Sequence, residues 1–133
     1  MNSPKPPLET LSRSQIEAVA VKAGFAGEDL AIAVAIAFAE SGGDPNSYDP
    51  ETAAKAPAGQ GSIGLWQIFR MEHPEFTTAD LTDPQVNACA AFSIYRNARS
   101  TFAPWATYME GKYKAFLAPV TPAPAAPEPG GVL

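Results

Sequence analysis

The stretch Leu30 to Gly43, LAIAVAIAFAESGG, limits most strongly what this chain can fold into. Ten apolar residues run without a break and end on the carboxylate of Glu40. Bulky residues alternate with alanines, as in a strand, but alanine is the best helix former and is depleted in strands. A glycine and two acids precede the run and two glycines follow Ser41, which suits the two ends of a helix. Because the run is too short to span a bilayer, we predict a buried central helix that ends at Glu40.

Glu40 would then lie where a charged carboxylate is disfavoured. Apolar neighbours oppose its ionisation, and so does the negative end of the helix dipole. Both effects raise the pKa of Glu40 toward the range in which a carboxylic acid donates a proton near neutral pH. The alternative is a glutamate that ends the helix and points into water, and the residues downstream bear on this choice.

Composition excludes several classes of function. The chain has 133 residues, enough for one domain with a modest core, and a net charge of −5. It shows no basic stripe, so nucleic-acid binding is not expected, and its acidity argues against electrostatic capture of anionic membranes. No stretch is long and apolar enough to span a bilayer, so membrane insertion is not expected either. With one cysteine, Cys89, and one histidine, His73, neither a disulfide nor a zinc or iron site is expected, and Cys89 is predicted to be a small buried residue on a helix. The acids near Asp44 depart from the calcium-loop pattern, since Tyr48 and Asp49 occupy its fifth and sixth positions, so no cofactor is expected.

The two ends of the chain differ from its middle. Residues 1–9, MNSPKPPLE, are proline-rich, lack the apolar segment of a signal peptide and are expected to form a disordered arm. Residues 119–133, PVTPAPAAPEPGGVL, are typical of an extended tail or linker and suggest a tether to another module. Residues 10–118 are therefore expected to form the folded domain.

Local signals predict a helix on each side of the middle of the domain. A capping box at Ser12 or Ser14 predicts a helix that begins there and ends at Gly24. Asp83 followed by Pro84 predicts a longer helix that runs to about residue 99.

The segment between these helices is less regular. Prolines make residues 44–61 a long loop, and residues 62–69 are expected to form a short strand or a tight turn that enters a helix. Residues 71–80 are expected to be irregular, and another short helix should open at Pro104. The predicted fold is mainly α, with a small irregular or β-hairpin region near residues 44–70.

Three segments, AESGGDP from residue 39, GLWQI from residue 64 and DPQVNACAA from residue 83, carry a family resemblance. In this order and spacing they resemble the soluble lytic transglycosylase and goose-type lysozyme superfamily, whose members cleave the glycan strands of bacterial peptidoglycan. The resemblance covers roughly residues 30–113. It implies a lysozyme-like α+β fold whose central helix ends at the catalytic glutamate.

The resemblance assigns roles to single residues. It implies that Glu40 is the catalytic acid and base, and that Ser41 helps to orient its carboxyl group. It implies that Gly64, Leu65 and Gln67 line the sugar cleft, where the glutamine and backbone groups contact N-acetyl sugars.

Three further positions match the family less directly. Asn87 matches an asparagine on the next helix that is structural or supports the site from behind. Tyr108 matches the tyrosine of a Tyr-Asn-Ala-Gly motif that bonds the catalytic carboxyl group, but the Asn-Ala-Gly is missing here. Trp66 stands where a methionine or another flexible apolar residue is usual, and it could stack on a sugar ring.

The chemistry depends on whether a second carboxylate takes part, since glycosidases generally use two. The candidates lie in polar loops: Asp44, Asp49, Glu51, Glu72 and Asp80. Without a second acid, Glu40 protonates the glycosidic oxygen and its carboxylate then deprotonates the C6 hydroxyl of muramic acid, which closes on C1. The product is a 1,6-anhydro sugar, and the substrate N-acetyl group could stabilise the cationic intermediate. With a loop acid that positions water, the same cleft becomes a hydrolase.

The sequence is therefore interpreted as a peptidoglycan lytic transglycosylase that cuts the β-1,4 bond between N-acetylmuramic acid and N-acetylglucosamine. The alternatives are a hydrolysing muramidase, an inactive wall-binding or structural virion module, and a helical interaction domain unrelated to the wall. Proline-rich ends without a signal peptide are typical, by resemblance, of bacteriophage endolysins or virion components, although a bacterial source also fits.

Overall fold

The computed structural model describes residues 10–49 and 61–117. The elements in order are α1 (Arg13–Ala23), α2 (Gly27–Ser41), β1 (Tyr48–Asp49), β2 (Ser62–Ile63), β3 (Ile68–Phe69), α4 (Thr78–Thr82), α5 (Pro84–Asn97), α6 (Ala106–Met109) and the 3-10 helix η1 (Lys112–Phe116). The fold is mainly α with a small β region, which confirms the predicted class. The arm and tail predicted for residues 1–9 and 119–133, and the middle of the predicted loop, lie outside the described residues.

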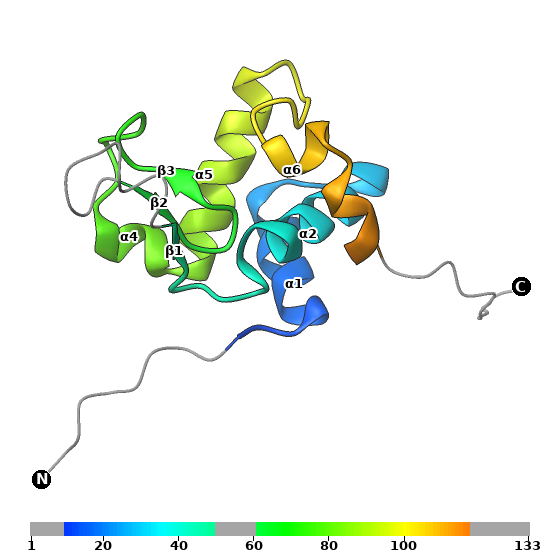
Figure 1. The fold of residues 1–133 in the computed structure, drawn as a ribbon, viewed down its shortest axis with the longest axis horizontal. Coiled ribbons are helices and arrows are strands. Elements are labelled where there is room, and N and C mark those ends of the chain that lie inside the picture. Colours follow the sequence, from blue (N-terminus) through cyan, green and yellow to red (C-terminus); the bar gives the residue numbers. More distant parts are fainter. Residues whose placement is uncertain (1–9, 50–60, 118–133) are drawn as a thin grey trace, which may run out of the picture.

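Helix α2 is central to the fold, as predicted. It packs against α1, α6 and η1 (Figure 1), and five consecutive residues, 33–37, are buried. The helix begins at Gly27 itself, with Ala26 as its N-cap, so the glycine that precedes the apolar run lies in the first turn of the helix. At the other end Gly42 adopts a left-handed conformation, and its N–H bonds the carbonyl oxygen of Phe38. This glycine cap ends the helix directly after Glu40 and Ser41.

The flanking helices begin where their capping signals place them. Ser12 caps α1 through a capping box with Gln15, and Asp83 caps α5 with Pro84 in the first turn. The prediction that residues 71–80 are irregular was wrong at their end. There Thr77 and Asp80 form a second capping box, which starts the short helix α4.

The β region is a three-stranded antiparallel sheet in the order β1-β2-β3. Tyr48 pairs with Ile63 across β1 and β2, and Ile63 pairs with Ile68 across β2 and β3. Residues 64–67 form the turn between β2 and β3. Residues 62–69 are therefore two short strands joined by a tight turn, so each of the two alternatives, a short strand or a tight turn that enters a helix, was correct only in part.

Helix α5 buries the face made by residues 87, 88, 90, 91 and 95. Cys89 lies on the other side of the helix and is exposed, so the prediction of a buried cysteine was wrong. The buried face contributes Tyr95 to an aromatic cluster, with its ring centroid 4.7 Å from that of Phe102 and 5.1 Å from that of Phe25. Across the two described stretches, no helix is both long and apolar enough to cross a membrane.

Candidate active site

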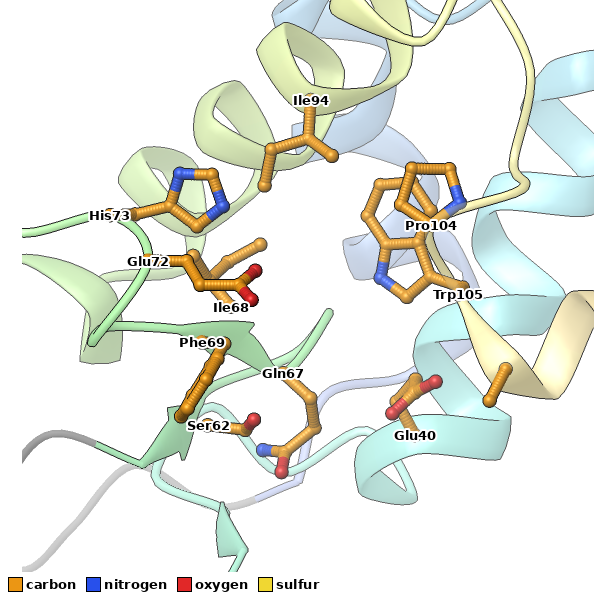
Figure 2. A pocket seen from close by; sticks show the side chains of 11 residues that line it. Glu40, Ser62, Gln67, Ile68, Phe69, Glu72, His73, Ile94, Pro104 and Trp105 are labelled. Carbon is orange, nitrogen blue, oxygen red and sulfur yellow. The ribbon is translucent and has the colours of Figure 1, made fainter. Parts of the chain in front are cut away.

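A pocket of about 340 Å³ opens beside the C-terminal end of α2. It is lined by Glu40, Ser62, Gln67, Ile68, Phe69, Glu72, His73, Ile94, Pro104, Trp105 and Ala106. Figure 2 shows the carboxyl groups of Glu40 and Glu72 on opposite sides, both turned toward the open space. Its size and its mixture of apolar walls with a few polar groups are those of a small-molecule site.

Glu40 lies in the last turn of α2 and is half-buried. The hydroxyl of Thr107 donates a hydrogen bond to Glu40 Oε2 over 2.8 Å. The rise in pKa expected for Glu40 from apolar neighbours and from the helix dipole stays a prediction. A hydrogen bond donated to the carboxylate lowers the pKa, so Thr107 opposes that rise.

The hydroxyl of Ser41 forms hydrogen bonds with the backbone at the C-terminal end of α2. Its Oγ donates to the carbonyl oxygen of Ala37 over 2.9 Å and accepts from the N–H of Gly43 over 3.2 Å. Since a serine hydroxyl has one proton, this geometry leaves none to donate to the carboxyl group of Glu40. Ser41 therefore supports Glu40 by fixing the helix end, rather than by orienting its carboxyl group directly.

Tyr108 packs its ring among other aromatic rings. Its centroid lies 5.0 Å from that of Tyr113 and 5.6 Å from that of Phe102. The carboxyl group of Glu40 instead accepts a hydrogen bond from Thr107, one residue earlier. Sequence reasoning missed Thr107, and the signal that could have found it was the departure of residues 106–111 from the family motif.

Gly64 begins the turn between β2 and β3 and has a φ of +84°. A Cβ atom at this position would lie 2.2 Å from Asn87 Nδ2 and 2.4 Å from the carbonyl oxygen of Leu81. The N–H of Gly64 donates to the carbonyl oxygen of Ser47 over 2.8 Å. Both the backbone conformation and the close approach therefore require glycine here.

Asn87 is fully buried behind this turn, with 0% of its surface exposed. Its Oδ1 accepts from the N–H of Trp66 over 2.9 Å, and its Nδ2 donates to the carbonyl oxygens of Ile63 and Leu81, each over 2.9 Å. All three contacts are to backbone, which makes Asn87 structural, one of the roles predicted for it.

Gln67 forms part of the pocket wall. Its φ is +50°, which is uncommon for a residue with a side chain. Its Nε2 donates to the carbonyl oxygens of Gly64 and Ser47, over 3.0 Å and 3.2 Å. The turn therefore holds the side chain of Gln67 at the wall of the same pocket that Glu40 lines.

Leu65 and Trp66 are buried, with 0% and 1% of their surfaces exposed. A sugar ring cannot stack on a covered indole, so the stacking role considered for Trp66 was wrong. Its Nε1 donates to the carbonyl oxygen of Ala33 on α2 over 2.9 Å, and its carbonyl oxygen accepts from Trp105 Nε1 over 2.9 Å. Trp66 thus connects the turn to α2 through a hydrogen bond, and the indole that lines the pocket is that of Trp105.

Glu72 is the described candidate for a second carboxylate that lines the pocket. Beside it lies His73, whose Nδ1 is 3.7 Å from Glu75 Oε2 and which sequence reasoning did not place in the site. Both lie within four residues of the end of β3, on the side of the pocket opposite Glu40 (Figure 2).

Two of the other candidate acids, Asp44 and Asp80, form hydrogen bonds with residues near them in the sequence. The carboxylate of Asp44 accepts from the N–H of Asn46 over 2.8 Å. Hydrogen bonds from the N–H and then the hydroxyl of Thr77 lower the pKa of Asp80. The side chain of Asp49 and all of Glu51 lie outside the described part of the chain. Within residues 10–49 and 61–117, no group of three or more histidine, cysteine or acidic side chains could hold a metal ion.

Comparison with known families gives one match. A family model described as "Lysozyme like domain" matches residues 17–107, more than half of the chain. The matched range includes Glu40, the hairpin that carries Gln67, and Thr107. No curated protein and no solved structure matches the chain.

Proposed function

We propose a function for this chain from one premise: it belongs to the lysozyme-like domain family. Membership places it among the glycan-cleaving domains of the lysozyme and transglycosylase superfamily, for which the substrate is peptidoglycan. The proposal is that it cuts the β-1,4 bond between N-acetylmuramic acid and N-acetylglucosamine by lytic transglycosylation. Glu40 is its catalytic residue.

The observation that carries this proposal is the setting of Glu40. Its carboxyl group is half-buried, is held by the hydroxyl of Thr107 and faces a pocket with Gln67 and Trp105 on its walls. A general acid must be positioned within reach of the atom that it protonates, and a glutamate fixed at a pocket wall meets that need. The amide of Gln67 suits a polar group of a sugar, and Trp105 adds an apolar wall to the pocket.

The proposed reaction has two proton transfers. Protonated Glu40 gives its proton to the glycosidic oxygen as the bond to C1 of the muramic acid breaks. The N-acetyl group of the substrate stabilises the cation at C1. The Glu40 carboxylate then takes the proton of the C6 hydroxyl as O6 bonds to C1, which restores the acid and consumes no water.

Hydrolysis is the second candidate, and Glu72 is the observation that favours it. A carboxylate across the pocket from the acid is the arrangement in which a base activates water on the opposite face of the sugar. An inactive wall-binding or virion module is the third candidate, and the missing Asn-Ala-Gly is the observation in its favour. Thr107 weakens the case for an inactive module, because it donates a hydrogen bond to the Glu40 carboxyl group from the same segment.

Mass spectrometry of digested peptidoglycan tests these readings. The wild type should release products lighter by one water than hydrolytic ones, and Glu40→Gln should release none. Glu72→Gln should keep the anhydro product. The matched control is Glu17→Gln, which changes an exposed glutamate on α1 and should behave as the wild type. Hydrolytic products, without the loss of water, that disappear in Glu72→Gln would establish the hydrolase. If the wild type and Glu40→Gln release the same products, or if neither releases any, the enzymatic function is refuted.

The place of action that follows is the bacterial cell wall. A phage endolysin or virion component, tethered through residues 119–133, stays part of the proposal, resting on the proline-rich composition of the flanks.

A further inference from the structure

We infer that Thr107 is a positioning residue for the proposed acid: its hydroxyl holds the Glu40 carboxyl group in one orientation at the pocket wall. The role rests on the proposed function of Glu40. The contact that motivates it is the 2.8 Å hydrogen bond from Thr107 Oγ1 to Glu40 Oε2.

The donor is held in place by the fold. Thr107 lies in α6, whose N-cap residue is Trp105. The side chain of Trp105 is 5% exposed and donates to the carbonyl oxygen of Trp66 over 2.9 Å. Threonine has two heavy atoms on its Cβ, which restricts its χ1 rotamers. The backbone of α6 therefore limits where the hydroxyl can lie, and the N-cap residue of α6 is anchored by a hydrogen bond to the turn that carries Gln67.

The contact acts in both protonation states of Glu40. When the carboxyl group is ionised, the hydroxyl of Thr107 donates its one proton to Oε2. When Glu40 is protonated, the same hydroxyl can keep donating to Oε2 or accept the acid proton from it, because a threonine hydroxyl is both a donor and an acceptor. The contact therefore keeps the carboxyl group in the same orientation before and after proton transfer.

The same contact acts on ionisation. A hydrogen bond to a charged carboxylate is stronger than one to a neutral carboxyl group, so Thr107 stabilises the ionised form of Glu40. Removing the hydroxyl should raise the pKa of Glu40. Because the protonated form starts the reaction, the alkaline limb of the kcat/KM profile should then move to higher pH.

Other titratable groups surround Glu40 and stay unchanged in the test. Glu72 and His73 share its pocket. On the elements packed against α2, Arg13 of α1 lies over the Phe38 ring and Lys112 of η1 pairs with Glu110. The remaining groups on these elements are Glu17, Lys22, Tyr108, Tyr113 and Lys114. A shift of the limb in a Thr107 variant is then assigned to the lost hydroxyl.

Two variants separate the hydroxyl from the shape of the side chain. Thr107→Val keeps the branched shape and removes the donor, whereas Thr107→Ser keeps the donor. The matched control is Thr101→Val, which removes an exposed hydroxyl that donates to the carbonyl oxygen of Ala98. Glycan cleavage is followed as kcat/KM against pH, and the carboxyl carbon of Glu40 is titrated by NMR, with Glu40→Gln to assign the signal.

Thr107→Val should lower kcat/KM about tenfold or more, the effect of losing a hydrogen bond to a charged group. Its alkaline limb and its NMR titration should both move to higher pH, while Thr107→Ser and Thr101→Val should follow the wild type. An unmoved titration in Thr107→Val would overturn the inference, whatever the activity. If the wild type and Glu40→Gln cleave equally, the proposed function falls, and the titration still decides the role of Thr107.

Discussion

Replacing Gly64 by alanine tests how the turn beside the pocket is held. The φ of Gly64 is +84°, and an alanine Cβ would lie 2.2 Å from Asn87 Nδ2 and 2.4 Å from the carbonyl oxygen of Leu81. The second atom belongs to the backbone at the end of α4, and the first belongs to a side chain with no exposed surface. Neither can turn aside freely, so the turn, the asparagine or both must move.

The expected loss has two parts. Holding a residue other than glycine at this φ costs about 1 kcal/mol. Displacing the Asn87 amide breaks its two Nδ2 hydrogen bonds, to Ile63 and Leu81, each worth about 1 kcal/mol net. The free energy of unfolding should therefore fall by about 3 kcal/mol, a large share of the roughly 5–15 kcal/mol of a typical domain.

Gly111→Ala is the matched control. Gly111 has a φ of +77°, but nothing lies within 4 Å of a Cβ placed there. It should lose only the backbone part, about 1 kcal/mol. Urea unfolding of the wild type and both variants measures the difference. If the two variants lose the same free energy within about 0.5 kcal/mol, the close approach to Asn87 costs nothing and the account of the turn is refuted.

Two further predictions concern the scaffold. Asp83→Ala removes the side chain that accepts from the N–H groups of Gln85 and Val86, so the free energy of unfolding in urea should fall by about 1 kcal/mol. Asp83→Asn should lose little, and equal losses in the two variants would contradict the capping role. Tyr95 donates to Asp29, and this bond, followed by burial, raises its pKa above 10.0. Tyr95→Phe should therefore be less stable than the wild type below pH 10, and the gap should narrow at higher pH, where the unfolded chain ionises first; a gap independent of pH would refute this.

Sequence patterns predicted the elements that depend on near neighbours. Ser12, Gly42 and Asp83 end or begin helices through contacts with residues two to four positions away, so their signals are complete within a short window. The apolar run of α2 predicted burial because it leaves no polar face. The start of α4 at Thr77 carried the same kind of signal and could have been predicted.

What the sequence did not reveal depends on distant contacts. Thr107 reaches Glu40 from 67 positions along the chain, and no local pattern marks such a pair. Trp66 was expected at the sugar because its segment matches a cleft motif, but its indole is turned toward the backbone of α2. Cys89 was expected inside because cysteine is usually buried, and helix phase decided otherwise.

A chain of hydrogen bonds explains how a site that departs from its family motif can keep a positioned acid. Trp66 donates to Ala33 on α2, and Trp105 donates to Trp66. Trp105 caps α6, where Thr107 donates back to Glu40 on the same α2. The carboxyl group is thus held by a series of contacts that starts and ends on α2, with the backbone of α6 joining Trp105 to Thr107. Because these contacts use the two indoles and one hydroxyl, the absence of Asn-Ala-Gly after Tyr108 still leaves a hydrogen-bond donor at Glu40, the proposed acid.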